Sequence, residues 1–194
     1  MSKSMFADLE KWEARKEGLA ARRFLPRESI NMFSKRITEK VMELPEVIAA
    51  KEVFCYAAMI DEVQTVDLMQ ALLDAGKNIC IPLIRCRGSM EAVRVTSFDD
   101  LETGKYGILT VKPGREILVK AAEIDCAIIP GSAFGRDQSR VGMGGGFYDR
   151  FLLLTKKAKR VGVCFGCQLK DTVPVERHDL FMDVIVTESE LIKK

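Results

Sequence analysis

The sequence predicts one α/β domain spanning residues 1–194, in which helices cover both faces of a mainly parallel central sheet, giving three layers. Three observations support this prediction. Short apolar runs rich in β-branched residues alternate along the chain with segments whose apolar residues recur at helical spacing. The 194 residues, 47% of them hydrophobic, are enough for a substantial core. The chain also contains no internal repeat, linker or low-complexity segment that would divide it.

Two helices are predicted ahead of the first strand. Residues 6–22 place three apolar side chains near helical spacing among many charges, which is typical of a surface helix with one packed stripe. Pro26 suits the first turn of a second helix that extends to about Leu44. We therefore expect the N-terminal region to be helical up to the first strand.

Strands and helices then alternate along the rest of the chain. Residues 90–96 alternate openly between apolar and polar side chains, so we expect an edge strand there. The other predicted strands are shorter apolar runs of the kind found in a buried sheet. The expected strands are 53–59, 78–81, 90–96, 125–129, 160–165 and 184–186, and the expected helices are 65–75, 116–122 and 148–158.

Charge and composition narrow the partners and the location. Thirty basic against 28 acidic residues give a formal net charge of +2, which does not indicate nucleic acid or an anionic membrane as the main partner. The first ten residues carry charges where a signal peptide needs an apolar core, and no apolar run is long enough to span a bilayer. We therefore expect a cytoplasmic protein, and a monomer because no exposed apolar repeat is evident.

The cysteine pattern favours reduced core residues over disulfides. Cys55, Cys80, Cys126 and Cys164 lie inside apolar strand-like runs, where a free cysteine behaves as a small hydrophobic residue. Cys164 and Cys167 have the spacing of half a zinc site, but no second pair completes it. A metal or redox role for this pair is therefore disfavoured.

The glycine-rich segment 130–149, PGSAFGRDQSRVGMGGGFYD, predicts a phosphate-binding loop between a strand and a helix. Glycine lets the backbone adopt positive φ and approach an anion closely, and the amides of the following helix supply donors. The segment lacks the Gly-Lys-Ser/Thr of a Walker A loop and the third glycine of a dinucleotide fingerprint. A tight or flexible turn is the alternative that glycines alone leave open. The glycines concerned are Gly142, Gly144, Gly145 and Gly146.

Polar residues at three other places favour a binding site. Arg140 precedes the glycines, and Tyr148 and Asp149 follow them with an aromatic ring and a carboxylate. Lys11 and Arg15 are four residues apart, so both lie on one helical face and together could hold a polyphosphate. The spacing by itself equally describes a solvated charged face, which is the commoner case.

Two acidic residues also flank predicted strands. Glu62 follows the first strand, at the edge where ligands bind in parallel sheets, whereas Asp183 lies at the start of the last strand. Taken alone, Asp183 is better interpreted as a turn residue and Asp149 as a residue that favours a helix N-terminus.

Four ordered blocks of this sequence resemble those of the 5-formyltetrahydrofolate cyclo-ligase family, also called methenyltetrahydrofolate synthetases. The resemblance covers nearly the whole chain. The blocks are Lys-x-x-x-Arg at 11–15, Glu-Val-Gln-Thr at 62–65, the glycine-rich segment 130–149, and Pro-x-Glu-x-His-Asp with the following Asp and Thr-Glu at 174–188.

The resemblance implies an ATP- and Mg²⁺-dependent cyclisation of 5-formyltetrahydrofolate to 5,10-methenyltetrahydrofolate, which releases ADP and phosphate. ATP is then a co-substrate, and the partners are small molecules. The residue roles that it implies fall into three groups. Lys11, Arg15, Arg140, Gly142, Gly144, Gly145 and Gly146 bind ATP, with Lys11 and Arg140 acting in catalysis; Glu62, Gly145, Phe147 and Tyr148 bind the folate; Asp149 and Asp183 hold Mg²⁺.

Several positions depart from the family pattern. Gly135 stands where the family usually has Asp, Gln138 where it usually has Gly, and Phe147 replaces the first of two tyrosines. Leu83 follows Pro82 where a basic residue is common. These departures keep two alternatives open: a catalytically silent folate- or nucleotide-binding regulator, and an ATP-dependent ligase acting on another formamide. Phe147 is as well suited to core packing as to substrate contact, and the single histidine, His178, has no assigned role.

Overall fold

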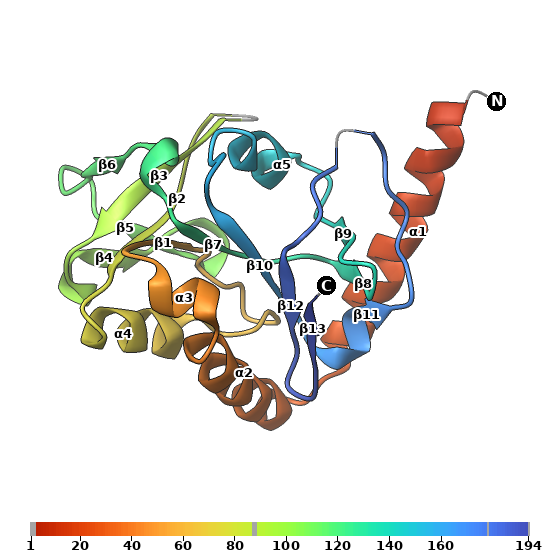
Figure 1. The fold of residues 1–194 in the computed structure, drawn as a ribbon, viewed down its shortest axis with the longest axis horizontal. Helices are drawn as coiled ribbons and strands as arrows, with labels where there is room; N and C mark the ends of the chain where they lie inside the picture. Colours follow the sequence, from red (N-terminus) through yellow and green to blue (C-terminus); the bar gives the residue numbers. More distant parts are fainter. Residues whose placement is uncertain (1–2, 87–88, 178, 194) are drawn as a thin grey trace.

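A computed structural model describes residues 3–86, 89–177 and 179–193; His178 lies outside the described residues. An eight-stranded sheet forms its centre (Figure 1). In spatial order the strands are β13 (Leu191–Lys193), β12 (Val184–Val186), β10 (Lys159–Val163), β7 (Cys126–Ile129), β1 (Glu52–Cys55), β2 (Asn78–Cys86), β3 (Ser89–Val95) and β6 (Leu118–Val119).

The middle of the sheet is parallel and its two edges are antiparallel. β12, β10, β7, β1 and β2 pair in parallel, whereas β13 at one edge and β3 and β6 at the other pair antiparallel. Parallel neighbours need crossover connections, which α4 (Val66–Asp74) supplies between β1 and β2 and α5 (Phe147–Leu152) supplies between β7 and β10. All strands of the parallel part therefore end at the same edge of the sheet.

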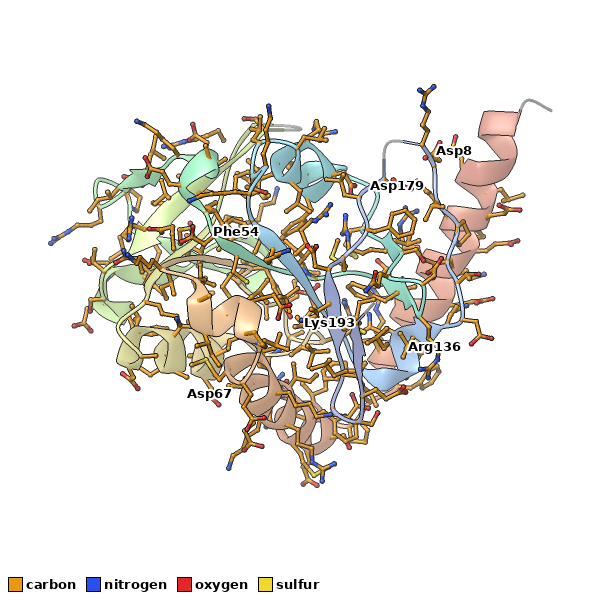
Figure 2. All side chains as sticks on the ribbon, viewed as in Figure 1. Asp8, Phe54, Asp67, Arg136, Asp179 and Lys193 are labelled. Carbon is orange, nitrogen blue, oxygen red and sulfur yellow. The ribbon has the colours of Figure 1, made fainter. Side chains whose placement is uncertain are left out.

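Helices cover both faces of the sheet, because the side chains of each central strand alternate between two cores. Val53 and Cys55 of β1 belong to the core that α2 (Arg27–Met42), α3 (Pro45–Ala49) and α4 cover. Phe54, between them, points to the opposite core and packs on Phe151 of α5, with ring centroids 4.7 Å apart. Phe54 lies inside the molecule, whereas charged side chains project from the surface of the molecule (Figure 2). The predicted three-layer α/β class is confirmed.

The N-terminal helix α1 (Lys3–Arg23) packs beside a second, smaller sheet rather than on the main one (Figure 1). That sheet has the order β11 (Leu169–Lys170), β8 (Ala133–Gly135) and β9 (Arg140–Val141), and the 3-10 helix η4 (Gly166–Gln168) adjoins it. Gly18 permits the approach of α1, because a Cβ there would lie 2.1 Å from the carbonyl oxygen of Ser132. The glycine-rich loop thus begins directly beside this helix.

The predicted helix 116–122 is wrong. Leu118 and Val119 form strand β6, which pairs with β3, and residues Ala121–Glu123 make one 3-10 turn, η3. A seven-residue segment has little helical stability of its own, so the hydrogen bonds offered by the edge of β3 determine its conformation. It follows that β3 is not the edge strand that its alternation predicted; β6 lies outside it.

The remaining differences concern lengths and short elements. The predicted strand 53–59 leaves the sheet after Cys55, and the helix that starts near Tyr148 ends at Leu152. Elements that the sequence pattern did not reveal include α3 and the small sheet. They also include β13 and η4, together with η1 (Phe98–Asp100), β4 (Leu101–Thr103), η2 (Lys105–Gly107) and β5 (Leu109–Val111), of which β4 and β5 pair antiparallel.

The β8–β9 turn explains two departures from the family pattern. Gln138 has φ 74°, a left-handed conformation that glycine adopts without strain, and its side-chain amide donates to the carbonyl of Asp183 at 3.1 Å. A Cβ on Gly135 would lie 2.2 Å from Oδ1 of Asp137, which accepts from the amide of Ser139 at 3.1 Å. Asp137 thus occupies the space that a longer side chain at position 135 would need.

Cys55, Cys80, Cys126 and Cys164 are buried and free, as predicted, and Cys167 is exposed. Burial raises the pKa of the Cys126 thiol to about 12, which makes it inert at neutral pH. Among the described residues, no helix has the length and apolar character needed to cross a bilayer.

Candidate active site

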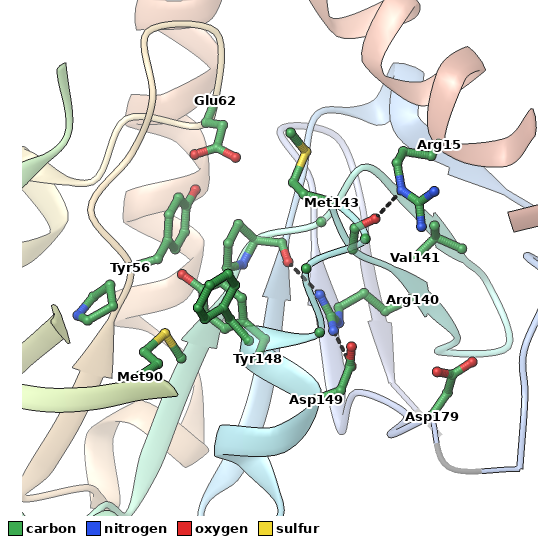
Figure 3. Close-up of a pocket in the computed structure, with 18 of the residues that line it drawn as sticks. Arg15, Tyr56, Glu62, Met90, Arg140, Val141, Met143, Tyr148, Asp149 and Asp179 are labelled. Atoms are coloured by element: carbon green, nitrogen blue, oxygen red, sulfur yellow. Dashed lines mark hydrogen bonds and ion pairs between the residues drawn. The ribbon is translucent and has the colours of Figure 1, made fainter. Parts of the chain in front are cut away.

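A cavity of about 340 Å³ opens where the parallel strands end. Tyr56 and Ala57 follow β1, Pro130 and Gly131 follow β7, and α1 lines one side. The cavity brings together segments that are far apart in the chain (Figure 3). The predicted site residues that line it are Lys11, Arg15, Glu62, Arg140, Gly142, Gly144, Gly145, Gly146, Phe147, Tyr148 and Asp149.

The structure does not bring Asp183 to this cavity, which corrects the predicted pairing of Asp149 with Asp183 around one cation. Asp183 precedes β12, and its Oδ2 accepts from the backbone amide of Arg160 at 2.8 Å and from Nε of Arg160 at 3.3 Å. Because parallel strands begin at one sheet edge and end at the other, Asp183 lies opposite the cavity. Asp179, four residues earlier, lines the cavity instead.

On the α1 side, Lys11 is held by two carboxylates. Its Nζ lies 2.6 Å from Oε2 of Glu176 and 2.5 Å from Oδ2 of Asp179. Burial opposes the charge of Lys11, but the hydrogen bonds to Asp179 and Glu176 outweigh it and raise the pKa of the ammonium group. Lys11 is therefore charged at neutral pH, and it ties α1 to the segment that carries Asp179.

Arg15 joins the same helix to the glycine-rich loop. Its Nε donates to the carbonyl of Gly142 at 2.8 Å, as Figure 3 shows. Gly144 and Gly146 have φ of +92° and +63°, so this loop conformation requires residues without a Cβ. The helical spacing of Lys11 and Arg15 does place both at the cavity, as predicted.

Arg140 is more enclosed than a simple phosphate ligand. Only 2% of its side chain is exposed, and its guanidinium donates to the carbonyl of Pro130 at 3.1 Å and to Oδ1 of Asp149 at 2.5 Å. Its Nε is buried without a hydrogen-bond partner among the described residues. The guanidinium also lies 5.9 Å from the ring centre of Tyr148. Arg140 thus holds Asp149, whose side chain is 30% exposed, at the cavity wall.

The opposite half of the cavity is aromatic and apolar (Figure 3). Glu62 is 6% exposed there; its Oε2 accepts from the amide of Met59 at 2.9 Å and its Oε1 from Nη1 of Arg22 at 3.3 Å. Burial raises the pKa of the Glu62 carboxyl, against the lowering effect of the Met59 amide and Arg22. Tyr56, Met90 and Tyr148 lie on this side, and the apolar side chains of Pro82, Ile84 and Ile108 also line the cavity.

Two departures from the family pattern have different surroundings. Phe147 lines the cavity and also packs against the core on the α5 side. Its position therefore combines the two predicted alternatives, contact with the cavity and core packing. Leu83 packs against the core under α2 and α4 and is not among the cavity-lining residues. Its neighbours Pro82 and Ile84 line the cavity, because successive side chains of a strand point to opposite faces.

Sequence reasoning missed several polar or polarisable residues at the cavity, among them Asp8, Tyr56, Met143, Glu176 and Asp179. A signal existed for Glu176 and Asp179, since both belong to the fourth block, 174–188. Tyr56 and Met143 offered no comparable signal. Tyr56 was assigned to a strand, and its hydroxyl donates to the carbonyl of Val63 at 2.7 Å.

The fold and the cavity define an α/β protein that binds small molecules at the carboxyl edge of its sheet, between a cationic half and an aromatic half. The sequence profile of the 5-formyltetrahydrofolate cyclo-ligase family matches residues 7–188. The chain belongs to this family, which is a family of ligases.

Individual relatives agree with this assignment. The chain is 29% identical over 174 residues to the 5-formyltetrahydrofolate cyclo-ligase of Escherichia coli K12, covering 88% of this chain and 96% of that one. It is 32% identical over 181 residues to a probable 5-formyltetrahydrofolate cyclo-ligase of Schizosaccharomyces pombe, covering 84% and 88%. The solved structure of Aquifex aeolicus 5,10-methenyltetrahydrofolate synthetase superimposes with a TM-score of 0.83 at 30% identity, covering 94% and 92%.

Proposed function

We propose that the protein uses ATP and Mg²⁺ to cyclise 5-formyltetrahydrofolate to 5,10-methenyltetrahydrofolate, with release of ADP and phosphate. One observation carries the proposal: residues from all four sequence blocks line one cavity, with cations on one side and an aromatic half with one carboxylate on the other. The family membership and the names of the relatives support the same reaction.

The chemistry explains why such a site needs two halves. The formamide oxygen is a poor leaving group, so the γ-phosphoryl group of ATP is transferred to it, giving ADP and an iminium phosphate. The lone pair of N10 then forms a bond to the formyl carbon, N10 loses its proton to the surrounding water, and the carbon–oxygen bond breaks to release inorganic phosphate. The protein has to align the reactants and stabilise charge, rather than supply a nucleophile of its own.

The cationic half fits the polyphosphate. Lys11 and Arg15 project from one helix, and Arg15 also contacts the loop that runs through Gly142 to Gly146. Lysine acts as a point charge and arginine as a planar donor, and both suit phosphate oxygens. Arg140 is enclosed, so in this proposal it acts mainly by fixing Asp149 and the glycine-rich loop.

The aromatic half fits the pterin. Glu62 presents a carboxylate on the side of the cavity that Tyr56 and Tyr148 line, which suits a planar ring with amino-type donors. Tyr148 is anchored edge-on against Phe54, with ring centroids 6.4 Å apart. Burial raises the pKa of Tyr148 well above its ordinary value, so its ring is neutral at physiological pH.

Asp149 and Asp179 are the residues that would hold Mg²⁺. Both line the cavity, and carboxylate oxygens are ligands that this hard cation prefers. No group of three metal-binding side chains occurs within the described residues, so phosphate oxygens and water would complete the coordination. Bound there, the cation would neutralise charge on the polyphosphate.

The test is to mix the purified protein with 5-formyltetrahydrofolate, ATP and Mg²⁺ and to follow the near-ultraviolet absorbance of the methenyl product. We expect a rise that needs all three components. Lys11→Ala should abolish most of it, whereas Arg136→Ala, which removes a half-exposed arginine paired with Glu190, should not.

Two outcomes would contradict the proposal. A folate that raises the melting temperature without any ADP release would indicate a binding protein that lacks turnover. ADP release with another formamide but not with the folate would indicate a ligase of different specificity.

A further inference from the structure

Arg22, near the end of α1, is a buried arginine that the proposed reaction leaves unused. Only 2% of its side chain is exposed. Its Nη2 donates to both carboxylate oxygens of Asp61 at 3.0 Å, and its Nε donates to Oδ2 at 3.2 Å. This two-pronged contact fixes the plane of the guanidinium, since the donor geometry of arginine matches that of a carboxylate.

The remaining nitrogen of Arg22 reaches the folate side of the cavity. Nη1 lies 3.3 Å from Oε1 of Glu62, while the amide of Met59 holds Oε2 at 2.9 Å. Both carboxylate oxygens are therefore fixed from the protein side, and each has a further lone pair for a donor in the cavity. The order of contacts is Asp61, then Arg22, then Glu62.

The charges around Glu62 make Arg22 the principal cation of this half. Asp61, on the same loop, repels the Glu62 charge, and Tyr56 and Tyr148 face it from the segment after β1 and from α5, with pKa values raised above the ordinary tyrosine value by burial. Cys167 lies near Arg22, and partial desolvation of its sulfur raises the pKa of the thiol, although the residue as a whole is exposed. These tyrosines and this thiol are neutral at physiological pH. Arg22 is therefore the group that counteracts the effects of burial and of Asp61 on the Glu62 carboxylate.

We propose that Arg22 is a positioning residue of the folate site, which keeps the Glu62 carboxylate ionised and directed into the cavity while Asp61 fixes Arg22. The inference rests on the proposed role of Glu62 in folate binding. Arg22 lies eleven residues after Lys11 on α1, which is about three helical turns. One helix thus carries the polyphosphate cations near its middle and the folate-positioning cation near its end.

The decisive variants are Arg22→Met, which removes the charge but keeps an apolar chain, and Arg23→Met as a matched control. Arg23 is the neighbouring residue, lies 3.8 Å from Asp61, and has a side chain that is 70% exposed. The measurement is the dissociation constant of 5-formyltetrahydrofolate by calorimetry, from mildly acidic to mildly alkaline pH, with the dissociation constant of ATP measured in parallel.

Wild-type folate affinity should fall as the pH is lowered and Glu62 takes up a proton. Arg22→Met should move the midpoint of this fall upward by about one pH unit or more, since an opposite charge at this distance shifts a carboxyl by about that amount. Arg22→Lys should lie between wild type and Arg22→Met. Arg23→Met should keep the wild-type midpoint, and ATP affinity should change less than twofold in each variant.

A purely structural role for Arg22 predicts a different result: a lower melting temperature with an unchanged pH midpoint, and this result would overturn the inference. If Arg22→Met does not fold, Asp61→Asn is the second variant, because it releases the guanidinium without removing its charge; an unchanged folate dissociation constant for that variant would also count against the inference. Wild-type protein that fails to bind the folate would instead refute the proposed function. The Glu62→Gln variant should show no pH midpoint at all.

Discussion

At the scale of single residues, three cations in and beside the cavity already have carboxylate partners. Lys11 pairs with Asp179 and Glu176, Arg140 with Asp149, and Arg22 with Asp61 and Glu62. Burying any one of these cations alone would be strongly unfavourable, and pairing offsets the loss of hydration. Substitutions on the acidic side should therefore affect the stability of the protein as well as its chemistry.

Glu62→Gln tests the balance between stability and binding. Burial raises the pKa of Glu62, so the folded protein holds this proton more tightly than the unfolded chain does. The resulting stability is fully present below the unfolded pKa and is lost as pH rises through the folded pKa. The variant should therefore gain stability relative to wild type as pH rises from acidic to neutral, in urea unfolding followed at several pH values. Its folate affinity should fall about 10- to 100-fold at neutral pH, as expected for a lost charge-assisted hydrogen bond.

The same series has an outcome that would contradict this argument. A stability difference that does not change with pH would mean that Glu62 titrates alike in the folded and unfolded chains.

Asp149→Asn should separate two roles of one carboxylate. It leaves the buried Arg140 guanidinium without a charged partner, and we expect a loss of about 1–2 kcal/mol in unfolding free energy, less than for a fully buried pair because Asp149 is partly exposed. Turnover should fall by about 100-fold or more, as for the loss of a group that stabilises developing charge. Thermal melting and the methenyl absorbance assay measure the two effects.

Asp171→Asn is the matched control for this substitution, since the Asp171 side chain is fully exposed and lies 3.9 Å from Nε of Arg136. Unchanged stability of Asp149→Asn would show that water or the Pro130 carbonyl suffices for Arg140. Unchanged turnover would remove Asp149 from the metal site.

At the scale of elements, the position of α1 decides whether the cationic half exists. This helix meets the small sheet through the Gly18 contact with Ser132 and through a cluster of Ala14, Ala133, Val141 and Val173. Because Lys11 and Arg15 are on the same helix, any shift of α1 moves both relative to the glycine-rich loop.

Gly18→Ala should therefore weaken ATP binding. Alanine improves helix propensity by about 1 kcal/mol, but overpacking against a backbone atom destabilises by about 1–3 kcal/mol, so we expect a net loss of stability. ATP affinity, measured by calorimetry, should fall by at least about tenfold, the equivalent of about 1.4 kcal/mol. Ala20→Gly, at an exposed position of the same helix, should lower stability without changing ATP affinity; equal ATP affinity in the two variants would contradict the argument.

The elements also show where sequence patterns suffice. The parallel strands were predictable because each is a short apolar run, and the cavity edge followed from the places where those runs end. The conformation of residues 116–122 was not predictable, because it depends on pairing with β3, and the local sequence pattern gives no information about that pairing. The two-residue strands of the small sheet depend on tertiary contacts in the same way.

The site residues also divide into those that local spacing predicts and those that depend on tertiary contacts. For the residues of the cationic half, on α1 and the glycine-rich loop, the spacing in the sequence predicts that they lie at the cavity. Asp183 and Asp179 lie four residues apart in one block, and only the start of β12 determines which of them reaches the cavity. The Arg22–Asp61 contact joins α1 to a loop 39 residues away, a relation that local spacing cannot reveal.

At the scale of the whole molecule, α1 lies outside the two main cores. Those cores are formed by the eight-stranded sheet and the helices that cover it. The segments with few buried apolar contacts open locally at lower free energy than the core strands.

The expectations that the protein is monomeric and cytoplasmic stay predictions.

Native-state hydrogen exchange should reveal this hierarchy. We expect the amides of α1 to exchange through a local opening of lower free energy than those of β1 and β7, the middle of the sheet. ATP with Mg²⁺ should slow exchange in α1 more than in the sheet, because the nucleotide would bridge the helix and the glycine-rich loop. Equal protection of α1 and β7 without nucleotide would show that the helix opens only on global unfolding.

The internal pairing of the cations has a thermodynamic consequence for the nucleotide. A polyphosphate that enters this cavity would exchange partners with Asp179 and Glu176, which hold Lys11, rather than meet an unpaired ammonium group. Its affinity is then the difference between two sets of ion pairs, which is smaller than either set alone. If phosphate and ADP depart as proposed, the same two carboxylates are in place to recapture Lys11. Such a site would limit the affinity for its own products and favour turnover over retention.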